Sequence, residues 1–467
     1  MEIGEFFLFY GMVIYVERGV IMYEHMQNYL GLDIYPFHMP GHKGNPMFFP
    51  QGLTNLDLTE IPGMDVLHRP DGIILEFQDA IASFYCADKS YLLVNGSTAG
   101  IVAAICATCN EGQKIYAARN GHVSMYNAIA MAGAEPIYLM PEITPDGLSG
   151  GIVLDEIEEG AVVFIVSPTY EGFVSDIKTI ADKVHSRGGL LIVDEAHGAH
   201  FRFHDYFPES ALDLGADIVV QSFHKTLPAL GQMAVLHVKG DRIDVGRMEY
   251  FLQVMQTTSP SYMMMGQLSY VLNMLWKRPE IFETYVNRLK GLRMALAANE
   301  VQAISLTGRE RIGMHGIYDI DLSKLLFRVN VYEKAEAISA MLASQYRVQL
   351  EMARGFHMLG MTTVADIDEG FQRMWGAIGS MNIKLEEGLE AKAEKLSPVI
   401  SRFDPEIVMS PSAAIYQDTE VVAWEQAHGR IAAEVVAAYP PGVAIVAPGE
   451  RIPEGLPKLS DKIRVIR

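Results

Sequence analysis

An aspartate and a lysine stand where two successive apolar runs end, and both are costly to bury without a partner. Asp194 ends the run Leu190–Asp194, and Lys225 follows the run Ile218–Ser222. A carboxylate at the end of a buried strand needs a cationic partner, and a protonated pyridine nitrogen is one such group. A lysine whose ammonium pKa is lowered by burial and neighbouring charge can attack a carbonyl carbon and form an imine. Together the two residues predict an imine-forming site.

A third segment has the residues of a phosphate-binding turn. Gly96-Ser97-Thr98-Ala99-Gly100 follows an apolar run and opens a helical pattern. Backbone N–H groups and two hydroxyls at a helix N-terminus suit an anion such as phosphate. Ser222 and His224, next to Lys225, could hold the same phosphate. By itself, however, a Ser/Thr turn is equally often only a helix cap.

Each residue also has a plainer interpretation. An isolated Lys225 would more often be a solvated charge, and Asp194 could simply cap the next segment. The letters Asp194-Glu195-Ala196-His197 also occur in nucleic-acid helicases. That class needs a G-x-x-x-x-G-K-[ST] loop, and no Gly-Lys-Ser/Thr occurs in the chain. The order of phosphate turn, Asp and Lys at successive strand ends favours the imine-forming site.

The elements that must position these residues alternate between short apolar runs and helical patterns such as 175–187. Several runs are apolar throughout, which is typical of strands buried on both faces, so we predict a doubly wound α/β sheet. Ligands bind such sheets beyond the carboxyl ends of the strands, where His122 also stands. The predicted strands are Tyr91–Asn95, Lys114–Ala118, Pro136–Met140, Val162–Ser167, Leu190–Asp194, Ile218–Ser222 and Met233–Val238.

Beyond Pro260 the pattern becomes helical, with predicted helices at Met263–Trp276 and Glu280–Asn299, and a second α/β segment follows from about Ile317. We therefore predict an N-terminal arm (1–45), a large cofactor-binding domain (46–300) and a smaller C-terminal α/β domain (301–467).

Composition narrows the range of partners and compartments. With 37 Lys and Arg against 57 Asp and Glu, the net charge of −20 disfavours nucleic acid and anionic membranes. The apolar run Phe6–Val16 is too short to span a bilayer. Three cysteines in 467 residues fit a reducing cytoplasm. His197 and His200 have no further ligands at metal spacing, so we expect no metal site.

The residues within several motifs point to one protein family more specifically than the order of the motifs along the chain does. Together they resemble the short branch of the ornithine/lysine/arginine decarboxylases, which are pyridoxal-phosphate enzymes of fold type I (the aspartate-aminotransferase fold). The resemblance runs from about Pro36 to the C-terminus. The motifs are Pro36-Phe37-His38-Met39-Pro40-Gly41-His42-Lys43-Gly44, Leu56-Asp57-Leu58-Thr59-Glu60, Val94-Asn95-Gly96-Ser97-Thr98, Asp194-Glu195-Ala196-His197-Gly198-Ala199-His200, Ser222-Phe223-His224-Lys225-Thr226-Leu227-Pro228-Ala229, Thr257-Thr258-Ser259-Pro260, Tyr439-Pro440-Pro441-Gly442 and Pro448-Gly449-Glu450.

The resemblance implies roles for individual residues around pyridoxal 5′-phosphate. Lys225 would carry the cofactor as a Schiff base, Asp194 would pair with its pyridine nitrogen, and His122 would stack on its ring. His197 would lie near the ring, and His224 would act near the reacting Cα. The phosphate would be held by Ser97, Thr98, Ser222 and His224, and by Thr257 from the neighbouring subunit.

The activity implied is α-decarboxylation of a basic L-amino acid (arginine, lysine or ornithine) to the amine and CO2, in amino-acid metabolism and polyamine biosynthesis. The resemblance also implies a homodimer with composite active sites. Two departures leave substrate choice open: Val123 stands where Lys usually follows the histidine, and Gly231 stands where Thr or Ser is usual. The alternatives are transamination, aldol cleavage, or a catalytically silent regulatory relative, which the intact Lys225 and Asp194 disfavour.

Overall fold

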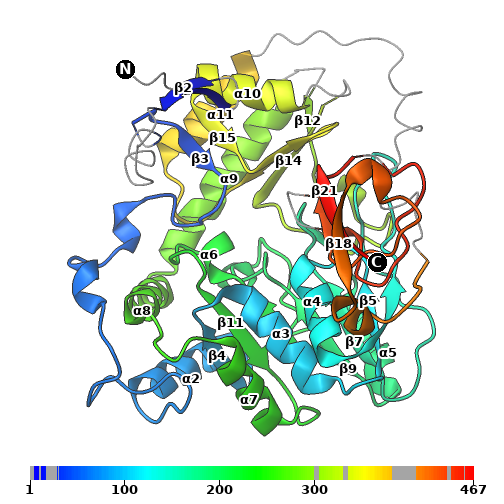
Figure 1. Ribbon diagram of the computed structural model, residues 1–467. Coiled ribbons are helices and arrows are strands. Elements are labelled where there is room, and N and C mark those ends of the chain that lie inside the picture. Colours follow the sequence, from blue (N-terminus) through cyan, green and yellow to red (C-terminus); the bar gives the residue numbers. More distant parts are fainter. Residues whose placement is uncertain are drawn as a thin grey trace.

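The protein has a large unit built on one seven-stranded sheet and a smaller unit built on a four-stranded sheet (Figure 1). The computed structural model describes residues 5–9, 12–16, 29, 31–298, 304–329, 335–380, 406–438, 443–456 and 458–467. The predicted boundary between residues 300 and 301 falls at 299–303, outside the described residues, so the division into three parts stays a prediction.

The large sheet is mixed, because β11 (Ala234–Val238) runs antiparallel to both of its neighbours while the other strand pairs are parallel. All seven predicted strands are present, which confirms the predicted α/β class. The first predicted strand lies two residues too late, since Asn95 caps the next helix. In spatial order the strands are β4 (Lys89–Leu93), β11 (Ala234–Val238), β10 (Ile218–Gln221), β9 (Leu190–Asp194), β7 (Val162–Val166), β5 (Lys114–Ala118) and β6 (Glu135–Leu139).

Helices cover the sheet, and their sequences reflect how deeply each is buried. α3 (Gly96–Thr108) is apolar on all sides, and every residue from Ala99 to Ala107 is buried. It approaches the sheet closely at Gly100, where a Cβ would lie 2.5 Å from a Leu93 methyl carbon, so a larger residue would have to displace that side chain. The other helices of this unit are α2 (Ile73–Tyr85), α4 (Val123–Ala132), α5 (Ile177–Ser186), the short α6 (Phe223–Thr226), α7 (Val245–Met255) and α8 (Tyr262–Lys277).

The smaller unit lies at the top of Figure 1, and α9 (Glu280–Ala298) leads into it. Its sheet has the order β12-β14-β17-β16 and is antiparallel. A parallel pair, β15 (Val348–Leu350) with β3 (Tyr35–Phe37), attaches the N-terminal segment to this unit. A second pair, β13 (Asp319–Ile320) with β8 (Phe173–Val174), links it to the large unit. The remaining elements are β12 (Ile304–Leu306), β14 (Lys324–Val329), α10 (Ala335–Tyr346), β16 (Met352–Arg354), β17 (His357–Met361) and α11 (Asp368–Ser380).

The last part of the chain packs against α4 through the short helix α14 (Pro411–Ile415). A buried ion pair also joins the two regions: Arg119 donates to both carboxylate oxygens of Glu450, at 2.5 and 2.8 Å, and to the Ile445 carbonyl. Both side chains are almost fully buried. The other described strands are β1 (Glu5–Phe9), β2 (Met12–Val16), β18 (Thr419–Ala423), β19 (Val436–Ala438), β20 (Val443–Val446) and β21 (Lys462–Ile466).

The motif Tyr439-Pro440-Pro441-Gly442 lies outside the described residues. Within the portions of the chain that are described, no helix is both long and apolar enough to cross a bilayer.

The Arg119–Glu450 pair predicts a large stability effect for a small chemical change. Glu450→Gln keeps the side-chain shape but leaves the buried Arg119 charge uncompensated, so we expect a loss of about 3–5 kcal/mol in the free energy of unfolding. Chemical denaturation measures it. The control is Glu406→Gln, which removes an exposed pair with Arg451 and should barely move the denaturation midpoint. Equal effects of the two changes would contradict the assigned importance of the buried pair.

Candidate active site

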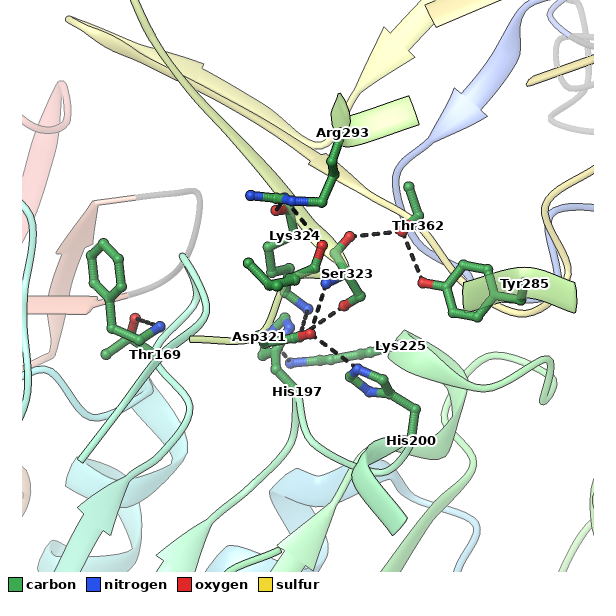
Figure 2. A network of polar contacts seen from close by, with 12 residues as sticks. Thr169, His197, His200, Lys225, Tyr285, Arg293, Asp321, Ser323, Lys324 and Thr362 are labelled. Carbon is green, nitrogen blue, oxygen red and sulfur yellow. Dashed lines mark hydrogen bonds and ion pairs between the residues drawn. The ribbon is translucent and has the colours of Figure 1, made fainter. Parts of the chain in front are cut away.

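Lys225 lies on a tight turn directly after β10, with its amine turned toward the residues that follow β9. Ser222 is the N-cap of the one-turn helix α6, which contains Lys225. The Lys225 Nζ lies 3.3 Å from His197 Nε2, and Figure 2 shows the two side chains pointing toward one another beneath Asp321. The turn is therefore built so that the amine faces inward rather than toward solvent.

Asp194 is the last residue of β9 and is buried. β9 and β10 are parallel neighbours in which Asp194 pairs with Val220, so the residues that follow the two strands meet at one edge of the sheet. One Asp194 oxygen accepts from the Ala196 N–H at 3.1 Å. Burial raises the pKa of the Asp194 carboxyl, and the charge of Lys225 opposes that shift. The carboxylate thus needs nearby positive charge to stay ionised.

The proposed phosphate end is formed by two turns that meet. Ser97, at the start of α3, and Ser222 have their hydroxyl oxygens 2.6 Å apart. Gly96 opens this helix with φ at +77°, a conformation that favours glycine. Thr98 is exposed. Thr257 is exposed as well, and its backbone N–H donates to Asn95 Oδ1 of the same chain at 3.4 Å, so its reach toward a second subunit stays a prediction.

Two of the predicted histidines are neutral near pH 7. His122 caps α4, its Nδ1 accepting from the Ser124 N–H, and burial and then the charge of Lys225 lower its pKa to about 4. Burial likewise lowers the pKa of His224 to about 4. The His224 Nδ1 lies 2.9 Å from the Met233 carbonyl, so it carries the proton of the neutral ring and donates it there.

The two positions that depart from the family's motifs are both described. Val123, where Lys is usual, begins α4. Gly231, where Thr or Ser is usual, is exposed with open space around it.

The site contains side chains that the sequence did not indicate. The Tyr170 ring stands edge-on to His197, with centroids 5.5 Å apart. Its hydroxyl donates to Glu351 at 3.0 Å. Tyr170 follows the end of β7. The expectation that ligands bind beyond the carboxyl ends of strands, which singled out Asp194, could therefore also have indicated Tyr170. Glu351 belongs to the smaller unit, and no local pattern indicated it.

Above His197, a buried polar network surrounds Asp321 (Figure 2). Asp321 accepts from the backbone and hydroxyl of Ser323 at 2.9 and 2.8 Å and lies 3.2 Å from His200 Nε2. Lys324 forms an ion pair with it at 3.5 Å, and its buried Nζ has no hydrogen-bond partner within the described chain. Burial lowers the pKa of Lys324 while Asp321 opposes that shift, and Lys324 lies close enough to Lys225 to act on its pKa.

The electrostatic surroundings favour a free amine on Lys225. Burial lowers its pKa, and Lys324 lowers it further, while the charges of Asp194 and Glu351 act in the opposite direction. The net direction is downward, so Lys225 is more readily deprotonated than an exposed lysine. An amine in this state is the form that attacks a carbonyl carbon.

These residues fit pyridoxal 5′-phosphate. The paired hydroxyls of Ser97 and Ser222 at a helix N-terminus suit its phosphate, and Asp194 suits a pyridinium nitrogen. The Lys225 amine suits its aldehyde. His197 Nδ1 is a buried polar atom without a hydrogen-bond partner among the described residues, as expected beside a polar ligand.

Comparison with known proteins gives a consistent result. A family model described as the major domain of Orn/Lys/Arg decarboxylases matches residues 21–335, and the model of their C-terminal domain matches residues 394–465. An arginine decarboxylase of Bacillus anthracis is 32% identical over 437 residues, covering 89% of this chain and 87% of the relative.

Two solved structures bear on the fold alone. The constitutive lysine decarboxylase of Escherichia coli has a TM-score of 0.72 at 17% identity, covering 96% of this chain and 84% of that one. A structure titled "SPT with PLP" has a TM-score of 0.55 at 14% identity, covering 73% of this chain and 86% of that one. The predicted fold type I is thereby confirmed.

The charges around Lys225 predict opposite shifts for two substitutions. Lys324→Met removes a neighbouring cation and should raise the pKa of the Lys225 amine, whereas Glu351→Gln removes an anion and should lower it. Competitive labelling of amines in the apoprotein across pH, read at the Lys225 peptide, measures both. Shifts of the same sign would rule out this electrostatic arrangement. Lys114→Met, at an exposed lysine paired with Glu158, is the control and should leave the Lys225 titration unchanged.

Proposed function

Because the chain belongs to the ornithine/lysine/arginine decarboxylase family, we propose that it removes the α-carboxylate of a basic L-amino acid as CO2 and releases the corresponding amine. The family makes it an amino-acid decarboxylase with pyridoxal 5′-phosphate as its cofactor. The observation that carries the proposal is the inward-facing amine of Lys225, held between His197 and the charges of Asp194 and Lys324.

The bound cofactor would supply an electron sink for the pair left behind when the carboxylate departs. Lys225 is the residue to which it would be attached covalently. Asp194 would keep a proton on the pyridine nitrogen, because a buried carboxylate is stabilised by that positive charge. Ser97 and Ser222 would anchor the phosphate, and His122 would pack against the ring.

After the carboxylate departs, Cα must receive a proton, and the hydrogen bonding of His224 favours Lys225 as the donor. The one proton of the neutral His224 ring is engaged with the Met233 carbonyl. The low pKa of His224 leaves its other nitrogen unprotonated at pH 7. The substrate α-ammonium must lose a proton before it can react, and the free amine of Lys225 would accept that proton and could return it to Cα.

The preference for a basic substrate has support in the charges of the site. Glu351 is only partly buried and lies close enough to Lys225 to affect its pKa. Its carboxylate would suit the cationic end of arginine, lysine or ornithine. Arginine is the first candidate, because the Bacillus anthracis relative is named an arginine decarboxylase. The net charge of −20 also favours the approach of cationic molecules.

The remaining expectations are part of the same proposal. We propose a cytoplasmic homodimer in which Thr257 completes the partner's phosphate site, with a product that enters polyamine biosynthesis. Transamination and aldol cleavage have no observation in their favour. A catalytically silent role is disfavoured by the complete set of Lys225, Asp194 and the two paired serines.

The direct test is product analysis with arginine, lysine and ornithine supplied separately. We expect CO2 and one amine in equal amounts, most rapidly from arginine. Borohydride treatment of the loaded protein should attach the cofactor to the peptide containing Lys225, and Lys225→Met should lose both the label and the CO2. A keto acid or an aldehyde as product, with no CO2, would refute decarboxylation.

The roles of Asp194 and Ser97 predict different kinetic signatures. Asp194→Asn should still bind the cofactor but lower kcat by about 10²-fold or more, because its charge acts on electrons that develop during the reaction. Ser97→Ala should mainly weaken cofactor affinity, and excess cofactor should largely restore the rate. If Asp194 were only a cap, its substitution would cost about 0.5–2 kcal/mol of stability at near-normal turnover. Melting temperatures and kcat values of both variants distinguish the two cases.

A further inference from the structure

One motif of the sequence has no role in the site described so far. It is the segment Met39–Lys43, here called the strap, which passes directly beneath the turn that carries Lys225. The Gly41 N–H donates to the His224 carbonyl at 2.8 Å. A Cβ at Gly41 would lie 2.6 Å from the Leu227 carbonyl oxygen and 3.0 Å from that of Lys225. Gly41 therefore allows an approach to the Lys225 turn that no larger residue could make without displacing it.

The other side of the strap is bonded to the smaller unit. The Thr363 hydroxyl donates to the Gly41 carbonyl at 2.6 Å. Lys43 Nζ donates to the Met361 carbonyl at 2.9 Å and back to the His38 carbonyl at 2.7 Å. The Met39 N–H donates to Glu351 at 2.9 Å. The same few residues thus contact the Lys225 turn on one face and the end of β17 on the other.

A second route of contacts leads from the strap back to the same lysine. Glu351, which accepts from Met39, also accepts from the Tyr170 hydroxyl. The Tyr170 ring contacts His197, and His197 faces Lys225 Nζ. Two series of contacts therefore hold the Lys225 amine in place, one through Gly41 and one through Glu351. Both include a residue of the strap.

We propose that the strap is a positioning device that holds the Lys225 turn against the smaller unit, with Gly41 and Thr363 as its positioning residues. This inference rests on the proposed function, in which Lys225 carries the cofactor. Loosening the strap would admit water to the amine and weaken the desolvation that lowers its pKa. The charged and titratable groups that face Lys225 are His122, Asp194, His197, His224, Lys324 and Glu351.

Two adjacent threonines provide a matched test. Thr363→Val removes the donor to Gly41, together with an acceptor for the Ala365 N–H at 3.2 Å, with little change in volume. Thr362→Val removes an equally buried hydroxyl that bonds the Ser323 carbonyl and Tyr285, not the strap. The measurement is the rate at which apoprotein captures pyridoxal phosphate on Lys225 across pH, with borohydride trapping at timed intervals and quantification of the labelled peptide. Melting temperatures of both apoproteins report on stability.

For Thr363→Val we expect the pH of half-maximal capture to rise by about one unit, which is a roughly tenfold lower fraction of free amine at neutral pH. Both variants should lower the melting temperature by similar amounts. Thr362→Val, however, should leave the pH profile of cofactor capture unchanged. A merely structural role for Thr363 predicts that the two profiles coincide, and that result would overturn the inference.

A glycine pair tests the other face of the strap. Gly41→Ala should slow capture on the order of 10- to 100-fold, because the added methyl group displaces the Lys225 turn. Gly291→Ala, the same change at an exposed glycine of α9 with open space around it, should capture at the normal rate. Equal rates for the two glycine variants would also count against the strap. Failure of the unaltered protein to capture cofactor on Lys225 would overturn the proposed function itself.

Discussion

The removal of the Lys225 amine from water is the interaction on which the rest of the site depends. Burial lowers the pKa of the Lys225 amine, whereas the charge of Asp194 raises it. The protein combines the two with a further cation, Lys324, so the balance of opposing charges determines how reactive the amine is. Asp194 ends β9, Lys225 lies in the short helix α6 and Lys324 begins β14, so the chemistry depends on the docking of whole elements.

The sequence predicted where Asp194 and Lys225 stand in the large unit, although it did not indicate Tyr170. Strands such as Leu190–Asp194 are buried on both faces, so a short run of apolar residues identifies them without an alternation of apolar and polar residues. Parallel pairing then brings the residues that follow neighbouring strands together, as the pairing of Asp194 with Val220 illustrates. The roles predicted for Thr98 and Thr257 from motifs are contacts with a bound phosphate, in the case of Thr257 in a second subunit. These roles therefore stay predictions.

The other half of the site was not accessible from the sequence for a physical reason. Glu351 and Lys324 lie on the smaller unit, and their distance from Lys225 depends on how two separately folded sheets dock. No local pattern encodes that docking. Gly41 is an intermediate case: its motif was recognisable, but the need for glycine follows from carbonyl groups almost two hundred residues later in the chain, at Lys225 and Leu227.

The ion pair between Arg119 and Glu450 has a consequence for the order of events during synthesis. The two residues are 331 positions apart in the chain. At typical elongation rates, Arg119 leaves the ribosome on the order of tens of seconds before Glu450 exists. Throughout that interval the strand end that leads to His122 carries a guanidinium with no carboxylate to neutralise it. The final packing at this edge therefore cannot form until the segment that contains Glu450 has been synthesised.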